Sequence, residues 1–150
     1  MRKSILTLVL TVLIGGCNNP PPATSHDVRF RVLDEGQTSG LIQQKFLTFH
    51  NEADFASFWN IHSNGNLSNM PKVNFNRKMV IAAFLGERRT GGYAVRIENI
   101  VELETMLQVE VLVTKPEPGS ERTMMITQPY TVVELPQTKK HIDYTFRMNR

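Results

Sequence analysis

The chain has 150 residues, which is the size of about one domain, and a formal net charge of +3. Its lysines and arginines are not clustered as they are on a nucleic-acid-binding surface, so the composition argues against that class of function. The chain contains a single cysteine and therefore forms no internal disulfide, so an apolar core must stabilise the fold.

Residues 1–16 have the layout of a secretory signal peptide. Arg2 and Lys3 supply positive charge, an apolar stretch covers residues 4–14, and two glycines lead to Cys17. The apolar stretch is far shorter than the roughly 20 residues that a membrane-spanning helix needs. Because loss of this peptide lowers the formal charge from +3 to +1, the high pI says little about partners.

The run Leu13-Ile14-Gly15-Gly16-Cys17 resembles a bacterial lipobox, in which the peptide is cut before the cysteine and the thiol is acylated with a fatty acid such as palmitate. The resemblance implies lipidation at Cys17 and a membrane anchor in the cell envelope, since each buried methylene contributes about 0.8 kcal/mol. Asn18 resembles a sorting signal for the outer membrane, facing the periplasm, in an envelope with two membranes. The alternative is an ordinary signal peptide with an incidental cysteine.

Residues 17–26 are predicted to form the lipidated N-terminus and a proline-rich linker, and residues 27–150 a single domain. Pro20-Pro21-Pro22 favours an extended linker. In the domain, Val28, Phe30 and Val32 alternate with arginines, which predicts a half-buried strand. After a turn at residues 36–40, Ile42, Gln44 and Phe46 alternate with polar neighbours, and the segment as far as Phe49 is predicted to form a second strand.

A helix is predicted over residues 51–63. Asn51 is a suitable N-cap, and acidic residues follow in the first turn, where the helix dipole favours anions. Four residues at spacings of three and four form one face of this helix. They are Phe55, Phe58, Trp59 and His62.

The second half of the chain is predicted to consist mainly of strands. Met79 to Leu85 is an unbroken apolar run, typical of a central strand buried on both faces. Alternating patterns predict a hairpin joined around residues 101–105 and two later strands. The apolar residues of the hairpin and of the later strands lie within residues 93–97, 107–113, 130–135 and 142–148.

About seven strands and one helix therefore make up the expected domain. A helix with an apolar face must cover a sheet, so the fold class is α+β, rich in strand, with one packed amphipathic helix. The regular alternation favours mostly antiparallel pairing.

The sequence contains no recognised catalytic or metal-binding motif, and we expect neither an enzyme nor a cofactor. The four histidines are scattered outside any His-Glu-x-x-His run, and no cysteine joins them in a metal-ligand pattern. There is no Gly-x-Ser-x-Gly turn and no phosphate-binding loop. His62 is interpreted as a histidine at the edge of the core. A set of catalytic residues that converges only in three dimensions is the alternative.

Two segments, residues 86–93 and 127–130, have the composition of constrained surface. Paired glycines that precede a strand predict positive φ, a bulge or close approach of another backbone, and neighbouring arginines are suited to carboxylates. Proline marks a sheet edge or the start of a strand, and tyrosine is suited to an interface. The alternative interpretation is turn chemistry and core packing. The predicted partner-binding residues are Arg88, Arg89, Gly91, Gly92, Tyr93, Pro129 and Tyr130.

These segments also carry a family resemblance. The chain reads Phe84-Leu85-Gly86-x-Arg88-x-Thr90-Gly91-Gly92-Tyr93, then a valine-rich strand and a Pro-Gly loop, then Pro129-Tyr130-x-Val132-Val133-x-Leu135-Pro136. This order resembles the C-terminal domain of the PrcB family over about residues 79–136. The family is named for a lipoprotein that accompanies and stabilises a surface protease.

The resemblance implies a membrane-anchored, non-enzymatic accessory lipoprotein. Such a protein would bind a secreted or surface protease through an exposed sheet edge and the segment from Arg88 to Tyr93. A structural envelope lipoprotein that binds another envelope component, with no protease link, is the main alternative. The sequence leaves the oligomeric state open.

Overall fold

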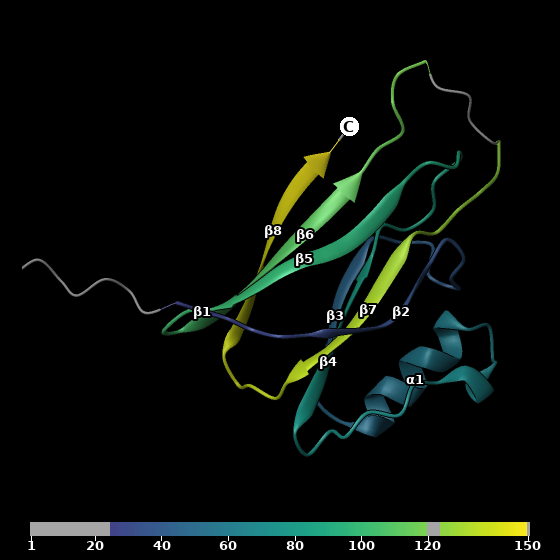
Figure 1. Cartoon of the computed structure of the whole chain (residues 1–150). Helices are drawn as coiled ribbons and strands as arrows, with labels where there is room; N and C mark the ends of the chain where they lie inside the picture. Colours follow the sequence, from purple (N-terminus) through teal and green to yellow (C-terminus); the bar gives the residue numbers. More distant parts are fainter. Residues whose placement is uncertain (1–24, 120–123, 150) are drawn as a thin grey trace, which may run out of the picture.

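The chain folds into eight strands, one α-helix and one short 3-10 helix over the residues that the structure describes (Figure 1). The structure is a computed structural model, and it describes residues 25–119 and 124–149. The strands are β1 (His26–Asp27), β2 (Arg31–Gly36), β3 (Lys45–Phe49), β4 (Lys78–Phe84), β5 (Ala94–Glu102), β6 (Met106–Thr114), β7 (Tyr130–Pro136) and β8 (His141–Asn149). The helices are α1 (Glu52–His62) and η1 (Leu67–Asn69).

This content confirms the predicted strand-rich α+β class. The predicted signal peptide over residues 1–16 lies outside the described residues. So do Cys17 and the linker as far as residue 24.

The strands form two four-stranded sheets packed face to face. The first sheet has the order β1-β5-β6-β8, and the second has the order β2-β7-β4-β3. Pairing is antiparallel throughout, except that β6 and β8 are parallel, so the prediction of mostly antiparallel pairing is confirmed. Helix α1 covers the outer face of the second sheet, which makes three layers (Figure 1).

Strand β4 is central in the second sheet and is buried on both faces, as its apolar run predicts. It pairs with β3 on one side and β7 on the other. Met79, Ile81 and Ala83 face the first sheet, whereas Val80 and Phe84 face α1. Since all of these side chains are 0 % exposed, a polar residue at any of them would need a buried partner.

Helix α1 begins and ends as the sequence predicts. The Asn51 side chain accepts a 2.9 Å hydrogen bond from the Asp54 backbone N–H, which satisfies a free donor of the first turn. The buried face of the helix packs on the second sheet and contains the predicted aromatic residues and His62. The helix C-cap is Ser63, and Gly65 follows with a φ of +90°.

Two strand predictions near the N-terminus are wrong in position. Residues 28–30 do not belong to a strand, because the chain crosses there from the first sheet to the second. Val28 and Phe30 still pack against the core between the sheets, which explains their apolar alternation. The second predicted strand begins only at Lys45, and Ile42 is 65 % exposed in the preceding connection.

Candidate functional site

The loop that follows β4 is held against another backbone at its start. Gly86 has a φ of +74°, and a Cβ built there would lie 2.7 Å from the backbone carbon of Gln43. The next residue, Glu87, donates its backbone N–H to the Ile42 carbonyl at 2.9 Å. Glycine is therefore required here both for the left-handed backbone and for the close approach.

The structure brings the two segments that the sequence singles out into direct contact. Arg88 and Thr127 exchange two backbone hydrogen bonds, of 2.7 and 2.8 Å, in an isolated antiparallel bridge. The Thr127 side chain is 2 % exposed, and its hydroxyl donates to the Thr90 carbonyl at 3.4 Å. Residues 86–93 and 127–130 are thus parts of one site.

Arg88 and Arg89 differ in how the loop holds them. The Arg88 guanidinium lies 5.6 Å from the centre of the Tyr93 ring, in a cation–π arrangement, and donates to the Glu87 carbonyl at 3.1 Å. Arg89 is exposed. Neither arginine forms an ion pair with another residue in the described part of the chain, and a guanidinium group is suited to binding carboxylates.

Gly92 fixes the far end of the loop. Its φ is +87°, and a Cβ there would lie 2.8 Å from Cβ of Pro116. The predicted positive φ is confirmed at this residue, whereas its close neighbour is a side chain and not the backbone that was predicted. Gly91, its neighbour, is not among the residues with positive φ.

Tyr130 does not lie on the surface, so that part of the prediction is wrong. The residue is 9 % exposed, and its ring stacks on Phe84 at 5.7 Å between centroids and meets His62 edge-on at 4.4 Å. Strand β7 is covered on both faces, and Tyr130 points to the face under α1. Pro129 is also buried and immediately precedes β7, and its carbonyl accepts from the Leu85 backbone N–H at 3.0 Å.

Exposed apolar side chains adjoin this loop on both sides. Ile42 is 65 % exposed, Met124 is 86 % exposed, and Met125 and Ile126 are both more than half exposed. We call these residues, together with the basic and aromatic residues of the 86–93 loop, the loop-end surface. It comprises Ile42, Arg88, Arg89, Tyr93, Met124, Met125 and Ile126.

Sequence reasoning missed residues 124–126, although Met124-Met125-Ile126 is an apolar run outside any predicted strand. Such a run in a loop is a signal for exposed apolar surface.

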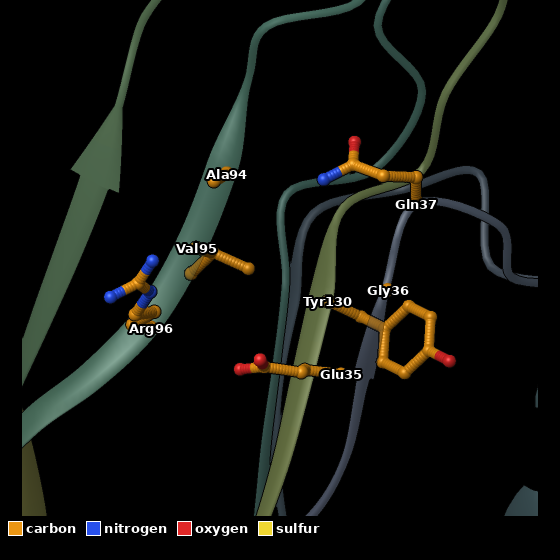
Figure 2. A pocket seen from close by; sticks show the side chains of 7 residues that line it. All are labelled: Glu35, Gly36, Gln37, Ala94, Val95, Arg96 and Tyr130. Atoms are coloured by element: carbon orange, nitrogen blue, oxygen red, sulfur yellow. The ribbon is translucent and has the colours of Figure 1, made fainter.

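A groove with a volume of about 220 Å³ lies between the end of β2 and the start of β5 (Figure 2). Glu35 extends from β2 toward β5, which carries Arg96, so opposite charges line its two sides (Figure 2). The groove adjoins the loop-end surface, since Ala94 follows Tyr93 directly. The Gln37 carbonyl at its rim accepts from the Gln128 backbone N–H at 2.8 Å.

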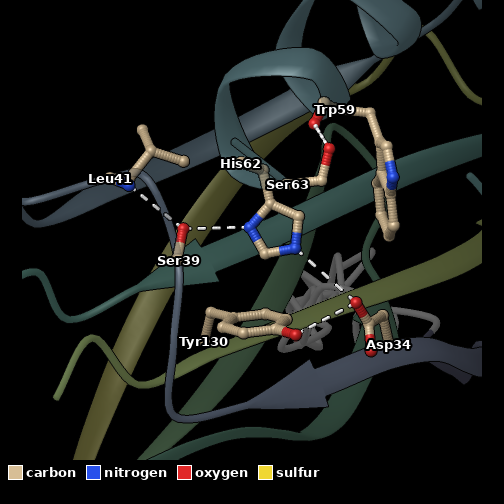
Figure 3. Close-up of polar contacts among 7 residues, drawn as sticks. All are labelled: Asp34, Ser39, Leu41, Trp59, His62, Ser63 and Tyr130. Carbon is tan, nitrogen blue, oxygen red and sulfur yellow. Dashed lines mark hydrogen bonds and ion pairs between the residues drawn. The ribbon is translucent and has the colours of Figure 1, made fainter. Parts of the chain in front are cut away.

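A second polar cluster is buried beneath α1 (Figure 3). The Ser39 hydroxyl lies 2.9 Å from His62 Nδ1, and His62 Nε2 lies 3.6 Å from Asp34 Oδ2. The Tyr130 hydroxyl donates to the same Asp34 oxygen at 3.0 Å. Burial lowers the pKa of His62, an effect that Asp34 partly opposes, and burial together with Asp34 raises the pKa of Tyr130.

The order serine, histidine, aspartate is that of a hydrolase triad, but the geometry supports a structural role. Ser39 is 5 % exposed, and its hydroxyl oxygen also accepts the Leu41 backbone N–H at 3.1 Å. A substrate therefore has no access to this hydroxyl. The cluster instead connects the 37–41 segment and β2 to the helix. The interpretation of His62 as a histidine at the edge of the core agrees with its 4 % exposure.

Residues 25–119 and 124–149 contain no helix that is long and apolar enough to cross a membrane. Over the same residues, no three or more His, Cys, Asp or Glu side chains are grouped so that they could hold a metal ion.

Comparison with known proteins bears on the segment that carries the loop. The family model described as PrcB C-terminal matches residues 79–136. The resemblance predicted from the sequence is confirmed over this PrcB C-terminal segment, which runs from β4 through β7 and contains loop 86–93. The chain matches no curated protein and no solved structure.

Proposed function

We propose that the chain is a membrane-anchored, non-enzymatic accessory lipoprotein that binds and stabilises a secreted or surface protease. The PrcB C-terminal match supports an accessory role in a protease complex, and the lipobox-like run that ends at Cys17 supports the anchor. The loop-end surface is the binding site in this proposal.

The observation that carries the proposal is the ordered 86–93 loop within the matched segment. The bridge between Arg88 and Thr127 and the contact of Gly86 with residues 42–44 hold the loop in one conformation. A loop that is ordered before binding loses little conformational entropy in the complex, so more of the contact energy appears as affinity.

The residues that the loop presents are those that stabilise interfaces. Arginine and tyrosine are enriched among the residues that dominate binding energy, and Arg88 is already oriented by the Tyr93 ring. Met124, Met125 and Ile126 add apolar area beside two arginines without a carboxylate partner in the described chain. The partner surface that fits this site is apolar with an acidic rim.

Site-specific crosslinking in intact cells tests the proposal. A photoreactive amino acid at Arg89 should capture a protein that hydrolyses casein after purification. The same amino acid at Lys139, which lies in the connection between β7 and β8 at the other end of the sandwich, should not. A captured protein without proteolytic activity, and an unchanged protease level on deletion, would point to a structural envelope protein and overturn the proposal.

A triple variant tests the surface itself. Arg88→Ala, Arg89→Ala and Tyr93→Ala together should abolish capture of the protease and leave the circular dichroism spectrum unchanged. A matched control, Lys72→Ala with Lys139→Ala, removes exposed cations away from the loop. If the triple variant retains the protease as well as this control does, the loop-end surface is not the binding site.

A further inference from the structure

Strand β8 is an open edge along its whole length. It is last in the order of the first sheet and pairs with β6 over all nine residues, so no strand lies on its other side in the described chain (Figure 1). Natural edge strands are usually blunted by Pro, Lys, bulges or short length. The β8 sequence, HIDYTFRMN, contains neither Pro nor Lys, and its register with β6 is unbroken.

One face of β8 carries an apolar row that extends past the core. Ile142 and Tyr144 pack against the core between the sheets, whereas Phe146 is 48 % exposed and Met148 is 68 % exposed. The Phe46 ring from β3 lies 5.2 Å from the Tyr144 ring and 5.1 Å from the Phe146 ring, between centroids. The exposed end of the row is therefore held in line with its buried end and is available to other apolar side chains.

The other face of β8 carries charges of both signs. The Nη1 of Arg147 binds Glu98 at 3.1 Å and Glu110 at 3.2 Å, which orients the guanidinium across the sheet. Its Nε and Nη2 donors make no bond to the described residues. The Asp143 side chain is exposed and has no ion-pair partner within residues 25–119 and 124–149.

We propose that the β8 edge binds a second copy of this chain, with the two β8 strands antiparallel and centred on Thr145. In that register every one of the nine residues has an opposite residue. The opposed pairs are His141 with Asn149, Ile142 with Met148, Asp143 with Arg147, Tyr144 with Phe146, and Thr145 with itself.

The pairs are complementary on both faces. Asp143 and Arg147 of the two copies lie directly opposite each other and form two opposite-charge pairs. Tyr144 and Phe146 form two aromatic pairs that cover the exposed end of the apolar row. The contact is isologous, so it closes as a dimer in which both β8 edges are covered.

Other registers lose this complementarity. Centring the pair on Asp143 or on Arg147 places like charges directly opposite each other. A slip of one residue places the polar row of one copy opposite the apolar row of the other. Centring on Tyr144 or Phe146 shortens the ladder and separates each Asp143 from Arg147. The dimer uses no residue of the loop-end surface. Its tests therefore can fail or succeed independently of the tests of the proposed protease binding.

Disulfide trapping tests both the dimer and its register. Directly opposed strand residues have Cα atoms about 4.5–5.5 Å apart, which is within the range of a disulfide. Thr145→Cys in the full chain, oxidised in the membranes of cells that produce it, should give a product of twice the mass of the uncrosslinked protein. His141→Cys should not, because its two copies are separated by roughly 27 Å at about 3.4 Å per residue. The unaltered chain, whose only cysteine is Cys17, sets the baseline.

Charge reversal provides a second measurement. Asp143→Arg turns both opposite-charge pairs into like-charge pairs and should raise the dissociation constant of the detergent-extracted dimer at least about tenfold. Glu104→Arg makes the same change of charge in the exposed turn between β5 and β6 and should leave the dimer intact. Sedimentation of both variants, with circular dichroism to confirm folding, gives the comparison.

Three results would overturn the proposal. The first is equal trapping by Thr145→Cys and His141→Cys. The second is a monomer for the unaltered chain at every concentration measured. The third is trapping of Thr145→Cys to a different protein, which would mean that β8 binds a strand from another partner.

Discussion

The backbones of Arg88 and Thr127 exchange two hydrogen bonds, of 2.7 and 2.8 Å, between the loop that follows β4 and the segment that precedes β7. This bridge joins the two ends of the PrcB C-terminal segment that carry its glycine- and proline-containing loops. Residues that are far apart in sequence therefore form one surface, and the order of that surface depends on a short pairing at its centre.

Breaking this bridge should loosen the loop without unfolding the domain. Thr127→Pro removes one donor of the pair, and a lost buried hydrogen bond costs about 1–3 kcal/mol. We expect the backbone amide of Arg88 to exchange its hydrogen at least about tenfold faster, because an opening of roughly 1.4 kcal/mol changes a population tenfold. Hydrogen exchange followed by mass spectrometry measures this. Ile126→Pro, one residue earlier and exposed, is the control, and equal exchange of Arg88 in the two variants would contradict the role of the bridge.

The glycine at the start of the loop should be the most sensitive to added volume. Gly86→Ala places a Cβ 2.7 Å from the backbone of Gln43 and also forces alanine into a φ of +74°. Gly65→Ala meets a similar φ, +90°, but has no atom within 4 Å of its Cβ. We expect Gly65→Ala to cost about 1 kcal/mol in unfolding free energy and Gly86→Ala at least about 1 kcal/mol more. Urea titration measures the loss of unfolding free energy in both variants. The strain of a positive φ is common to both, so the difference between them reports the steric overlap at Gly86. Equal losses would refute the close packing at Gly86.

Lipidation is a prediction that chemistry tests directly. Cells grown with labelled palmitate should incorporate label into the chain, and Cys17→Ser should abolish the label and move the protein out of the membrane fraction. The substitution changes one atom at the only cysteine, so loss of label has no other site to account for it. An unlabelled chain that retains residues 1–16 would mean that the lipobox-like run is not used.

The local elements could be predicted from the sequence because each has a short-range physical cause. The spacing of Phe55, Phe58 and Trp59, with Asn51 before them, specifies α1. The apolar run at β4 specifies a strand buried on both faces. The pattern of apolar residues along the sequence does not predict which distant segments pair, such as the parallel register of β6 with β8. The crossing at residues 28–30 was missed for the same reason, since apolar residues there pack on the core without belonging to a strand.

The site was predictable in part. The glycines and arginines of loop 86–93 identify a constrained segment by residue type alone, but contact with Thr127 depends on the long-range order of the second sheet. Alternation along β7 shows which residues share a face, but it cannot show that α1 covers the face of Tyr130. A tyrosine suited to an interface was therefore assigned to the surface, although it is bonded to Asp34 inside the protein.

The buried histidine predicts how stability depends on pH. Burial lowers the pKa of His62 below its ordinary value near 6.5, and Asp34 offsets only part of this effect. Below pH 6.5 the unfolded chain therefore binds a proton at this residue before the folded chain does. The contribution of His62 to stability is complete above pH 6.5, decreases as the pH falls toward the lowered pKa, and is constant below it.

Urea titration at several values between pH 8 and pH 5 should show this loss, and His62→Gln isolates it. Glutamine can still bond to Ser39 but does not titrate, so the difference in unfolding free energy between the two proteins should shrink as the pH falls through this window. Each unit by which the folded pKa is lowered corresponds to about 1.4 kcal/mol of that difference. A pH-independent difference would mean that His62 titrates alike in the folded and unfolded chain. The desolvation beneath α1 would then be compensated by Asp34, and the cluster would stabilise the fold through its hydrogen bonds alone.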